Sequence, residues 1–380
     1  MKKSPLLFLV FSLIAIGLVF ISISSLTEAS SSMGDKFFFL KKQSLWLVLS
    51  IICFYITSKI KLDFIKKFSF SIYIATLIAL LLVLVPGLSN ETLGARRWLN
   101  LGIFSIQPSE ILKFTSIIYF SFLFSIKEKR NIKSLIFYLS IPFALIILEP
   151  NLSTAILISA IIISIYYLSG GEIMPLFKLC GVAVFLSLLL IILSPYRYAR
   201  LKTLLNPQAE QSTSSYHSNQ IILALSSGGL FGKGFANSDQ KYRYLPKIST
   251  DSILAVIGEE MGFFGIMVIL LIYIYLITYL IKLSQIIPDP FQSLLVASVG
   301  CWIAYQSLIN ISAIVAIIPL TGVPLPFISY GGSSLLTLLS AVGLVHNIEK
   351  QNHLLIYSKG EIKGSTKENN HHRHPSHSRR

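Results

Sequence analysis

Residues 252–283 read SILAVIGEEMGFFGIMVILLIYIYLITYLIKL, a long apolar stretch whose only charged residues are Glu259, Glu260 and Lys282. About 20 consecutive apolar residues are enough to cross the hydrocarbon core of a bilayer as a helix. In lipid, the backbone must satisfy its hydrogen bonds within its own segment, which favours a helix over an isolated strand. The stretch therefore predicts a transmembrane helix in which both carboxylates face the bundle interior, either paired or protonated.

The rest of the chain has the same character. Of 380 residues, 53% are hydrophobic and 13% are charged, and the mean hydropathy is +0.71. A soluble domain with a solvated surface cannot carry this composition, so we expect an all-α polytopic membrane protein. About ten transmembrane helices are predicted, at Pro5–Leu26, Phe39–Thr57, Phe68–Val85, Pro108–Ile126, Ser134–Leu148, Leu152–Leu168, Leu176–Leu193, Ser252–Leu283, Phe291–Pro319 and Phe327–Ile348.

The lysines and arginines predict the orientation of these helices. Short loops at residues 59–67 and 127–133 are rich in Lys and Arg, which places them on the cytoplasmic side. An even number of spans then puts both termini in the cytoplasm. The alternate loops face outward, and the largest is a long polar loop at about 195–250, between the seventh and eighth helices.

The net charge of +15 would suggest a nucleic-acid partner in a soluble protein. Here the basic residues lie between apolar runs, so the membrane is the expected partner and nucleic acid is not. Cys53, Cys180 and Cys301 lie inside apolar runs with no CxxC spacing, so we predict no disulfide framework and no zinc site.

The chain divides into a transmembrane domain over residues 1–348 and a basic, His-rich tail over residues 349–380. The tail ends in HHRHPSHSRR. A solvated, disordered cytoplasmic tail is the expectation, and binding of a metal or of anionic lipid is the alternative.

One polar cluster surrounds the second outward loop. Arg96 and Arg97 suit phosphate oxygens, because guanidinium groups bind them in a forked geometry. Glu110 and Lys113 are three residues apart on the next helix, so they share a face. They are either a structural ion pair or part of a binding site.

A second cluster lies where the long loop enters the next helix. Asp251 is either an N-cap carboxylate or a group that accepts a proton from a hydroxyl nucleophile. Lys241 and Arg243, upstream of it, suit an anionic ligand or phospholipid headgroups. At the start of the last predicted helix, Ser329 and Tyr330 belong to a stretch of small residues that favours close helix packing but that also offers polar groups to a ligand.

These motifs occur together in one order. The sequence contains GARRW at 94–98, QPSEILK at 107–113, EPN at 149–151, SGGLFGKG at 227–234, GEEMGFFG at 258–265 and PLPFISYGGSSLL at 324–336. This series resembles the SEDS family, which includes FtsW, RodA and SpoVE.

The resemblance implies a peptidoglycan glycosyltransferase that polymerises lipid II on the outer face of the bacterial plasma membrane and releases undecaprenyl pyrophosphate. Asp251 matches the family's essential aspartate and would act as general base or as ligand of a divalent cation, Mg²⁺ or Mn²⁺. Arg96, Arg97, Lys113, Lys241 and Arg243 would then supply countercharge to the diphosphate.

The stretch around residues 227–246 is more similar to the FtsW branch than to RodA. This favours septal synthesis in cell division, with a class B penicillin-binding protein transpeptidase and other divisome proteins as partners, and with undecaprenyl-linked glycan as the product. A RodA-like elongation polymerase, a lipid II flippase and a noncatalytic divisome scaffold remain alternatives.

Two positions depart from the family pattern. Asn151 replaces an aspartate that commonly pairs with the lysine matching Lys113, so we predict that Glu110 or Glu149 pairs with Lys113 instead. Ser249 replaces a histidine next to the catalytic site. We expect activity to survive both changes because Asp251 is retained.

Overall fold

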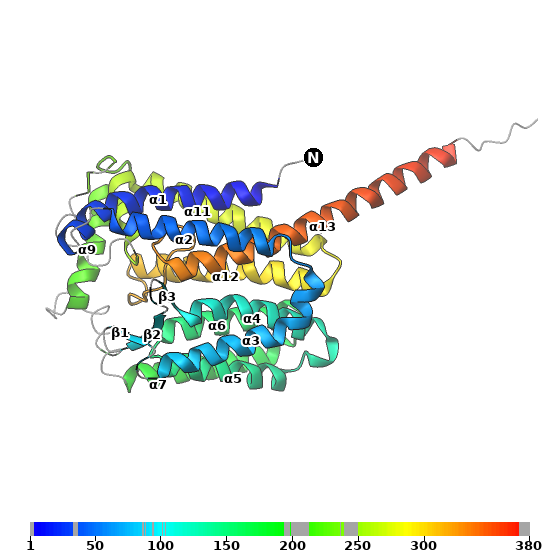
Figure 1. Ribbon diagram of the computed structural model, residues 1–380, viewed down its shortest axis with the longest axis horizontal. Coiled ribbons are helices and arrows are strands. Elements are labelled where there is room, and N and C mark those ends of the chain that lie inside the picture. The colour runs from blue at the N-terminus through cyan, green and yellow to red at the C-terminus, as the bar shows by residue number, and fades with distance from the viewer. Residues whose placement is uncertain are drawn as a thin grey trace, which may run out of the picture.

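The protein is a bundle of roughly parallel helices, seen in a computed structural model (Figure 1). The structure describes residues 4–32, 37–85, 87, 89–92, 95–100, 102, 104–193, 198, 213–235, 237–238 and 250–371. The helices are α1 (Pro5–Ser32), α2 (Phe38–Thr57), α3 (Leu62–Leu84), α4 (Pro108–Ser125), α5 (Ile132–Leu148), α6 (Leu152–Leu168), α7 (Ile173–Ile192), α9 (Thr213–Gly228), α11 (Ile253–Ile286), α12 (Pro290–Ile314) and α13 (Gly332–His371).

Each predicted apolar run falls on a helix of the structure, which confirms the polytopic helical fold. Within the described residues, five helices are long and apolar enough to cross a membrane: Pro5–Ser25, Phe38–Thr57, Leu62–Leu84, Ile253–Ile286 and Pro290–Ile314. Helices α5 and α6 are apolar but shorter. The number of crossings stays a prediction.

Helices α4 and α12 form the centre of the bundle. Helix α4 packs against α3, α6, α12 and α13, and α12 packs against α4, α6, α11 and α13. A central helix has no lipid-facing side, so its polar residues must find partners inside the protein. Glu110, Lys113 and Gln306 are all buried on these two helices.

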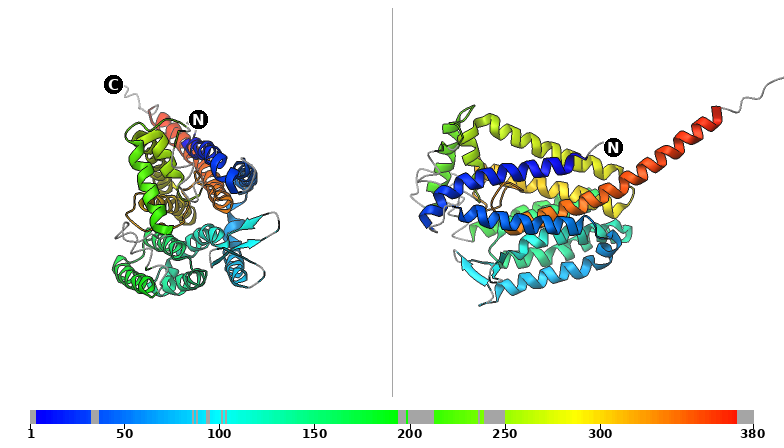
Figure 2. Two further views of the ribbon diagram at one scale, coloured as in Figure 1. Left: turned by 90° about the vertical axis from the view of Figure 1, so that its left-hand side faces the viewer. Right: turned by 45° about the horizontal axis from the view of Figure 1, so that its top comes forward.

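The features predicted to face outward gather at one end of the bundle. A three-stranded antiparallel sheet lies there, made of β1 (Ser89–Thr92), β2 (Ala95–Asn100) and β3 (Ser105–Ile106), together with α9 (Figure 1). The N-terminal start of α1 and the projecting part of α13 lie at the other end (Figures 1 and 2). This arrangement agrees with the alternation of loops, although the sheet itself is an addition to the expected all-helical architecture.

The boundaries of the last two helices differ most from the predictions. Helix α12 ends at Ile314 rather than Pro319, and α13 begins at Gly332 rather than Phe327, so a longer non-helical segment joins them. Pro319, Pro324 and Pro326 explain this, because proline cannot donate a helical hydrogen bond.

The packed domain also extends about one turn beyond residue 348. Glu349 and Asn352 are buried, and Asn352 donates from Nδ2 to Gln292 Oε1 over 3.0 Å. The backbone of α13 stays helical to His371. The predicted disorder of the tail stays a prediction for residues 372–380, which lie outside the described part of the chain.

Candidate functional site

A buried ion pair lies at the centre of the bundle. Lys113 Nζ lies 2.7 Å from Glu110 Oε1 and 2.7 Å from Oε2, and the two side chains come from successive turns of α4. Pro108 at the start of α4 suits the first helical turn, where an N–H has no intrahelical acceptor. Lys113 is only 1% exposed and Glu110 5%. The pairing predicted for Lys113 is confirmed, and Glu110 is the partner.

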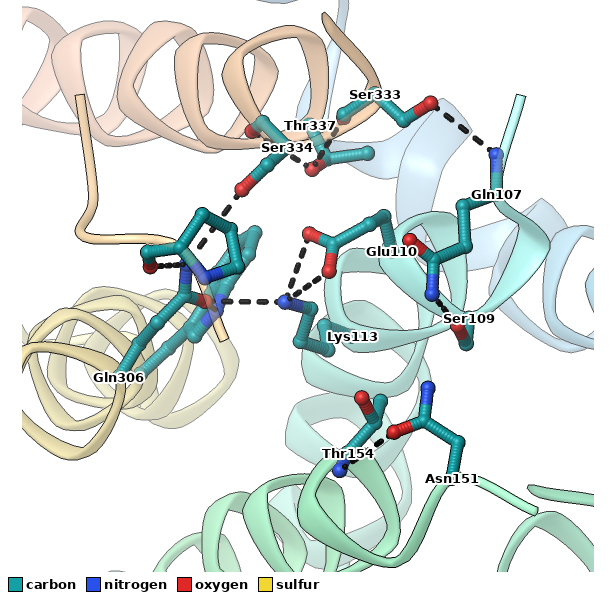
Figure 3. Close-up of polar contacts among 12 residues, drawn as sticks. Gln107, Ser109, Glu110, Lys113, Asn151, Thr154, Gln306, Ser333, Ser334 and Thr337 are labelled. Atoms are coloured by element: carbon teal, nitrogen blue, oxygen red, sulfur yellow. Dashed lines mark hydrogen bonds and ion pairs between the residues drawn. The ribbon is translucent and has the colours of Figure 1, made fainter. Parts of the chain in front are cut away.

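Helix α12 supplies a third member of this cluster (Figure 3). The Lys113 ammonium donates to Gln306 Oε1 over 3.0 Å, and Trp302 Nε1 donates to the same oxygen over 2.7 Å. The ammonium also lies 5.5 Å from the centre of the Trp302 ring, within cation–π range. The ammonium is therefore fully engaged, and a direct contact of Lys113 or Glu110 with a substrate stays a prediction.

Side chains from neighbouring helices hold the segment between α12 and α13. Gln306 Nε2 donates to the carbonyl of Pro324 over 2.9 Å, and Asn310 Nδ2 donates to the carbonyl of Val323 over 2.8 Å. The Tyr273 hydroxyl donates to the carbonyl of Pro326. Buried carbonyls without helical partners need such donors.

Asp251 lies against this same segment. A Cβ added to Gly322 would lie 3.8 Å from Asp251 Oδ2, so the carboxylate is the nearest group facing this glycine. The N-cap of α11 is Ser252, and Asp251 precedes it. The structure therefore places Ser252, rather than Asp251, at the N-cap position. Asp251 is partly exposed, as a group that meets a substrate must be.

Ser329 and Tyr330 have local partners. The backbone N–H of Leu325 donates to Ser329 Oγ over 2.9 Å, which closes a turn. The Tyr330 ring packs edge-on against Phe39, with ring centres 5.3 Å apart. These contacts favour the packing alternative for both residues. A role in substrate binding stays a prediction.

Arg97 holds the corner between α5 and α6. Its Nε donates to the Glu149 carbonyl over 3.2 Å and its Nη2 to the Pro150 carbonyl over 2.6 Å. Asn151 caps α6, because its Oδ1 accepts from the Thr154 N–H over 3.3 Å. Figure 3 shows Asn151 and Thr154 on the α6 side of the ion pair. Asn151, which replaces the family's aspartate, therefore serves as the N-cap of α6.

Glu149 stands out at this corner. It is 1% exposed, and neither carboxylate oxygen has a hydrogen-bond partner among the described residues. Burial raises the pKa of Glu149 to about 8, and the charge of Arg97 partly opposes this. Of the two carboxylates predicted as alternatives, Glu110 rather than Glu149 pairs with Lys113.

A second ion pair, with a buried carboxylate and a partly exposed lysine, attaches the glycine-rich loop to α11. Lys233 Nζ lies 2.9 Å from Glu259 Oε1, and Ser227 and Ser238 also donate to this carboxylate. Glu259 is fully buried, so the expectation that it faces the interior with a partner is confirmed. Lys233, one of the basic residues of the outer loop, is thereby neutralised.

The glycines of this loop permit close backbone contact. Gly232 has φ +80°, and a Cβ there would lie 2.2 Å from the carbonyl oxygen of Glu260. Helix α11 is kinked at Gly262, which has φ +66° and lies against the Gly232 backbone. Only glycine adopts these angles without strain, so the close contact requires glycine at both positions.

Three predicted site positions cannot be placed. Lys241, Arg243 and the side chain of Arg96 lie outside the described residues, as does Ser249. In contrast, the sequence reasoning overlooked Trp302, Gln306 and Asn310. Polar side chains within the apolar run 290–314 were the available signal, because such groups seek hydrogen-bond partners inside a membrane protein.

A divalent cation bound by Asp251 would need further ligands among the surrounding side chains. In the part of the chain that the structure describes, no three His, Cys, Asp or Glu side chains come together as a metal site requires. Asp251 alone supplies too few ligands for Mg²⁺ or Mn²⁺, because these ions prefer several oxygen ligands. The described residues therefore do not form such a site.

Comparison with known proteins places the chain in a family. Residues 4–354 match the family model described as cell cycle protein, FTSW_RODA_SPOVE. A probable peptidoglycan glycosyltransferase FtsW of Escherichia coli O6:H1 is 31% identical over 363 residues, covering 93% of this chain and 87% of the relative. Stage V sporulation protein E of Bacillus subtilis is 34% identical over 360 residues, covering 92% and 98%.

Solved structures agree on the fold. A chain of a peptidoglycan synthase complex that coordinates polymerization and crosslinking matches with a TM-score of 0.74 at 23% identity, covering 91% of this chain and 97% of that one. The rod shape determining protein RodA of Thermus thermophilus matches with a TM-score of 0.66 at 23% identity, covering 92% and 97%. The chain therefore belongs to the family of FtsW, RodA and SpoVE, and it is a multi-pass bacterial membrane protein.

Proposed function

We propose that this protein is a peptidoglycan glycosyltransferase that polymerises lipid II, and that Asp251 is its general base. The observation that carries the proposal is the position of Asp251. It is partly exposed, it precedes the N-cap of α11 rather than serving as the cap, and it lies against Gly322.

The chemistry is a glycosyl transfer between two lipid-linked sugars. Asp251 accepts the proton of the acceptor's 4-hydroxyl as that oxygen attacks the anomeric carbon of the donor. The bond from the anomeric carbon to the diphosphate breaks, and undecaprenyl pyrophosphate leaves with the electron pair. The developing negative charge needs cations nearby, and Arg96, Lys241 and Arg243 are the proposed source.

The relatives' names support the reaction class, since several are called probable peptidoglycan glycosyltransferase FtsW. We further propose a septal role, with both termini in the cytoplasm and a class B penicillin-binding protein as partner. The complex matched by fold couples polymerization to crosslinking, which supports a transpeptidase partner. Depletion of the protein should give filaments; spheres would instead indicate the elongation role.

The test is polymerisation of lipid II by purified protein with its transpeptidase partner. Asp251→Ala should lower the rate by about 100-fold or more, the scale of a lost general base. Asp289→Ala is the matched control. Asp289 caps α12 by accepting from the Gln292 N–H over 2.8 Å, so its loss should cost about 1 kcal/mol of stability and leave the rate unchanged.

The same variant separates the alternatives. If Asp251→Ala keeps full polymerising activity, the proposed function is wrong. If it still moves lipid II headgroups across liposomes while wild-type protein makes no glycan, the flippase alternative is correct. If growth is rescued by an inactive Asp251 variant, the scaffold alternative is correct.

A further inference from the structure

We infer that Gln306 and Asn310 are positioning residues for Asp251: they hold the backbone of Val323 and Pro324, and thereby fix Gly322 against the Asp251 carboxylate. The inference rests on the proposed function of Asp251. It concerns residues of α12 that act through the segment between α12 and α13 and do not touch the reacting sugars.

The side chains of Gln306 and Asn310 both point toward the segment between α12 and α13. Gln306 and Asn310 are four residues apart, so they lie on one face of α12. Gln306 is 0% exposed and Asn310 3%, so neither amide is held by solvent. Each donates to a carbonyl of the non-helical segment, at 2.9 Å and 2.8 Å respectively.

The orientation of the Gln306 amide is determined by its neighbours. Its Oε1 accepts from Lys113 and Trp302, and both of these groups can only donate. Nε2 must therefore point away from them, toward Pro324. The Glu110–Lys113 pair thus holds Gln306, and Gln306 holds the segment (Figure 3).

The segment faces Asp251 at Gly322. Gly322 directly precedes Val323 and has φ +71°, and a Cβ added to it would lie 3.8 Å from Asp251 Oδ2. Val323 is 4% exposed, and Pro324 has a fixed φ, so little freedom remains once the two carbonyls are held. A misplacement of about 1 Å at a reacting group costs about 100-fold in rate.

Asn310 contributes only through its N–H groups. Its Oδ1 is buried and has no hydrogen-bond partner among the described residues. A change at Asn310 therefore removes the hold on Val323 without disturbing Lys113, whereas a change at Gln306 must keep an acceptor for Lys113. The two positions give independent tests.

The experiment measures kcat, KM and the pH dependence of lipid II polymerisation with purified protein and its transpeptidase partner. Gln306→Glu keeps an acceptor for Lys113 and Trp302 but places a carboxylate oxygen against the Pro324 carbonyl. Asn310→Leu removes the donor to Val323 and keeps the volume. We expect kcat to fall about 10- to 100-fold in each folded variant, with KM changed by less than about threefold.

A second readout distinguishes positioning from general loss of structure. The acid limb of kcat/KM reports the pKa of the catalytic base. It should move by about half a pH unit or more in both variants, because the surroundings of Asp251 change. A smaller folded fraction would lower the apparent rate but would leave this limb in place.

Ser307→Ala is the matched control. Ser307 is buried on the same helix, and its hydroxyl donates to the Ile303 carbonyl of that helix over 2.7 Å. The control should keep wild-type kcat and an unmoved acid limb. An Asn310→Leu protein that folds with wild-type kcat and an unmoved limb would overturn the inference, as would an equal loss in Ser307→Ala. If Asp251→Asn stays active, the proposed function fails instead.

Discussion

Lys113 lies 2.7 Å from both carboxylate oxygens of Glu110, and both side chains are buried between α4 and its neighbours. Removing one partner of such a pair leaves an uncompensated charge, which costs about 3–5 kcal/mol. We expect Glu110→Gln and Lys113→Met each to lower the thermal stability of the detergent-solubilised protein strongly. The double variant should recover much of the loss. If the double variant is as unstable as the sum of the two, the pair is not the reason for the loss.

Asn151 caps α6 in this structure, and aspartate caps a helix about as well as asparagine. Lys113 already has Glu110 as its partner. Asn151→Asp should therefore change the rate of lipid II polymerisation by less than about twofold, because one capping residue replaces another. A rise of tenfold or more would mean that the lost carboxylate limits the activity and that the Glu110 pairing is no substitute.

Glu149 predicts a dependence of stability on pH. Its pKa rises from the ordinary 4.5 to about 8 in the folded protein, mainly through burial. Below pH 4.5 the Glu149 carboxyl is protonated in both the folded and the unfolded protein, so it does not change the free energy of unfolding. As the pH rises from 4.5 to 8, the unfolded chain releases the proton while the folded chain keeps it, so the free energy of unfolding falls.

Glu149→Gln removes this titration and keeps the shape of the side chain. From pH 6 to pH 8, its stability relative to wild type should rise by about 2 kcal/mol, since one pKa unit corresponds to about 1.4 kcal/mol. Thermal unfolding across this range measures the difference. A constant gap between the two proteins would contradict the raised pKa.

Gly232 allows the outer loop to reach the kink of α11. A Cβ at Gly232 would lie 2.2 Å from a backbone carbonyl, and the φ of +80° adds strain. Gly232→Ala should therefore destabilise the protein by about 1–2 kcal/mol or more and raise proteolysis of the loop. Gly181→Ala is the control, because nothing lies within 4 Å of a Cβ at that site. Equal effects at both positions would contradict the close contact.

The sequence predicted the parts of this protein that depend on local rules. The apolar runs predicted the helices, because a lipid-embedded backbone must bond within its own segment. The Glu110–Lys113 pair followed from a spacing of three residues on one helix. The order of the motifs along the chain indicated the family.

The remaining features depend on contacts between distant segments. Arg97 donates to carbonyls more than fifty positions away, and Gln306 joins α4 to a loop before α13. Neither contact has a periodic signal in one sequence. The short strands β1–β3 were not predicted. Strands of two to six residues show too little alternation of apolar and polar side chains to distinguish them from a polar loop.

The most direct test of the account is the rate at which purified Asp251→Asn protein polymerises lipid II with its transpeptidase partner. Asparagine keeps the size of the side chain. Its neutral amide is too weak a base to accept the proton of the 4-hydroxyl. If Asp251 is the general base, we expect a rate about 100-fold or more below wild type, with unchanged thermal stability and retained binding of lipid II. A folded Asp251→Asn protein that polymerises at more than about half the wild-type rate would contradict the central claim, because the expected loss is far larger.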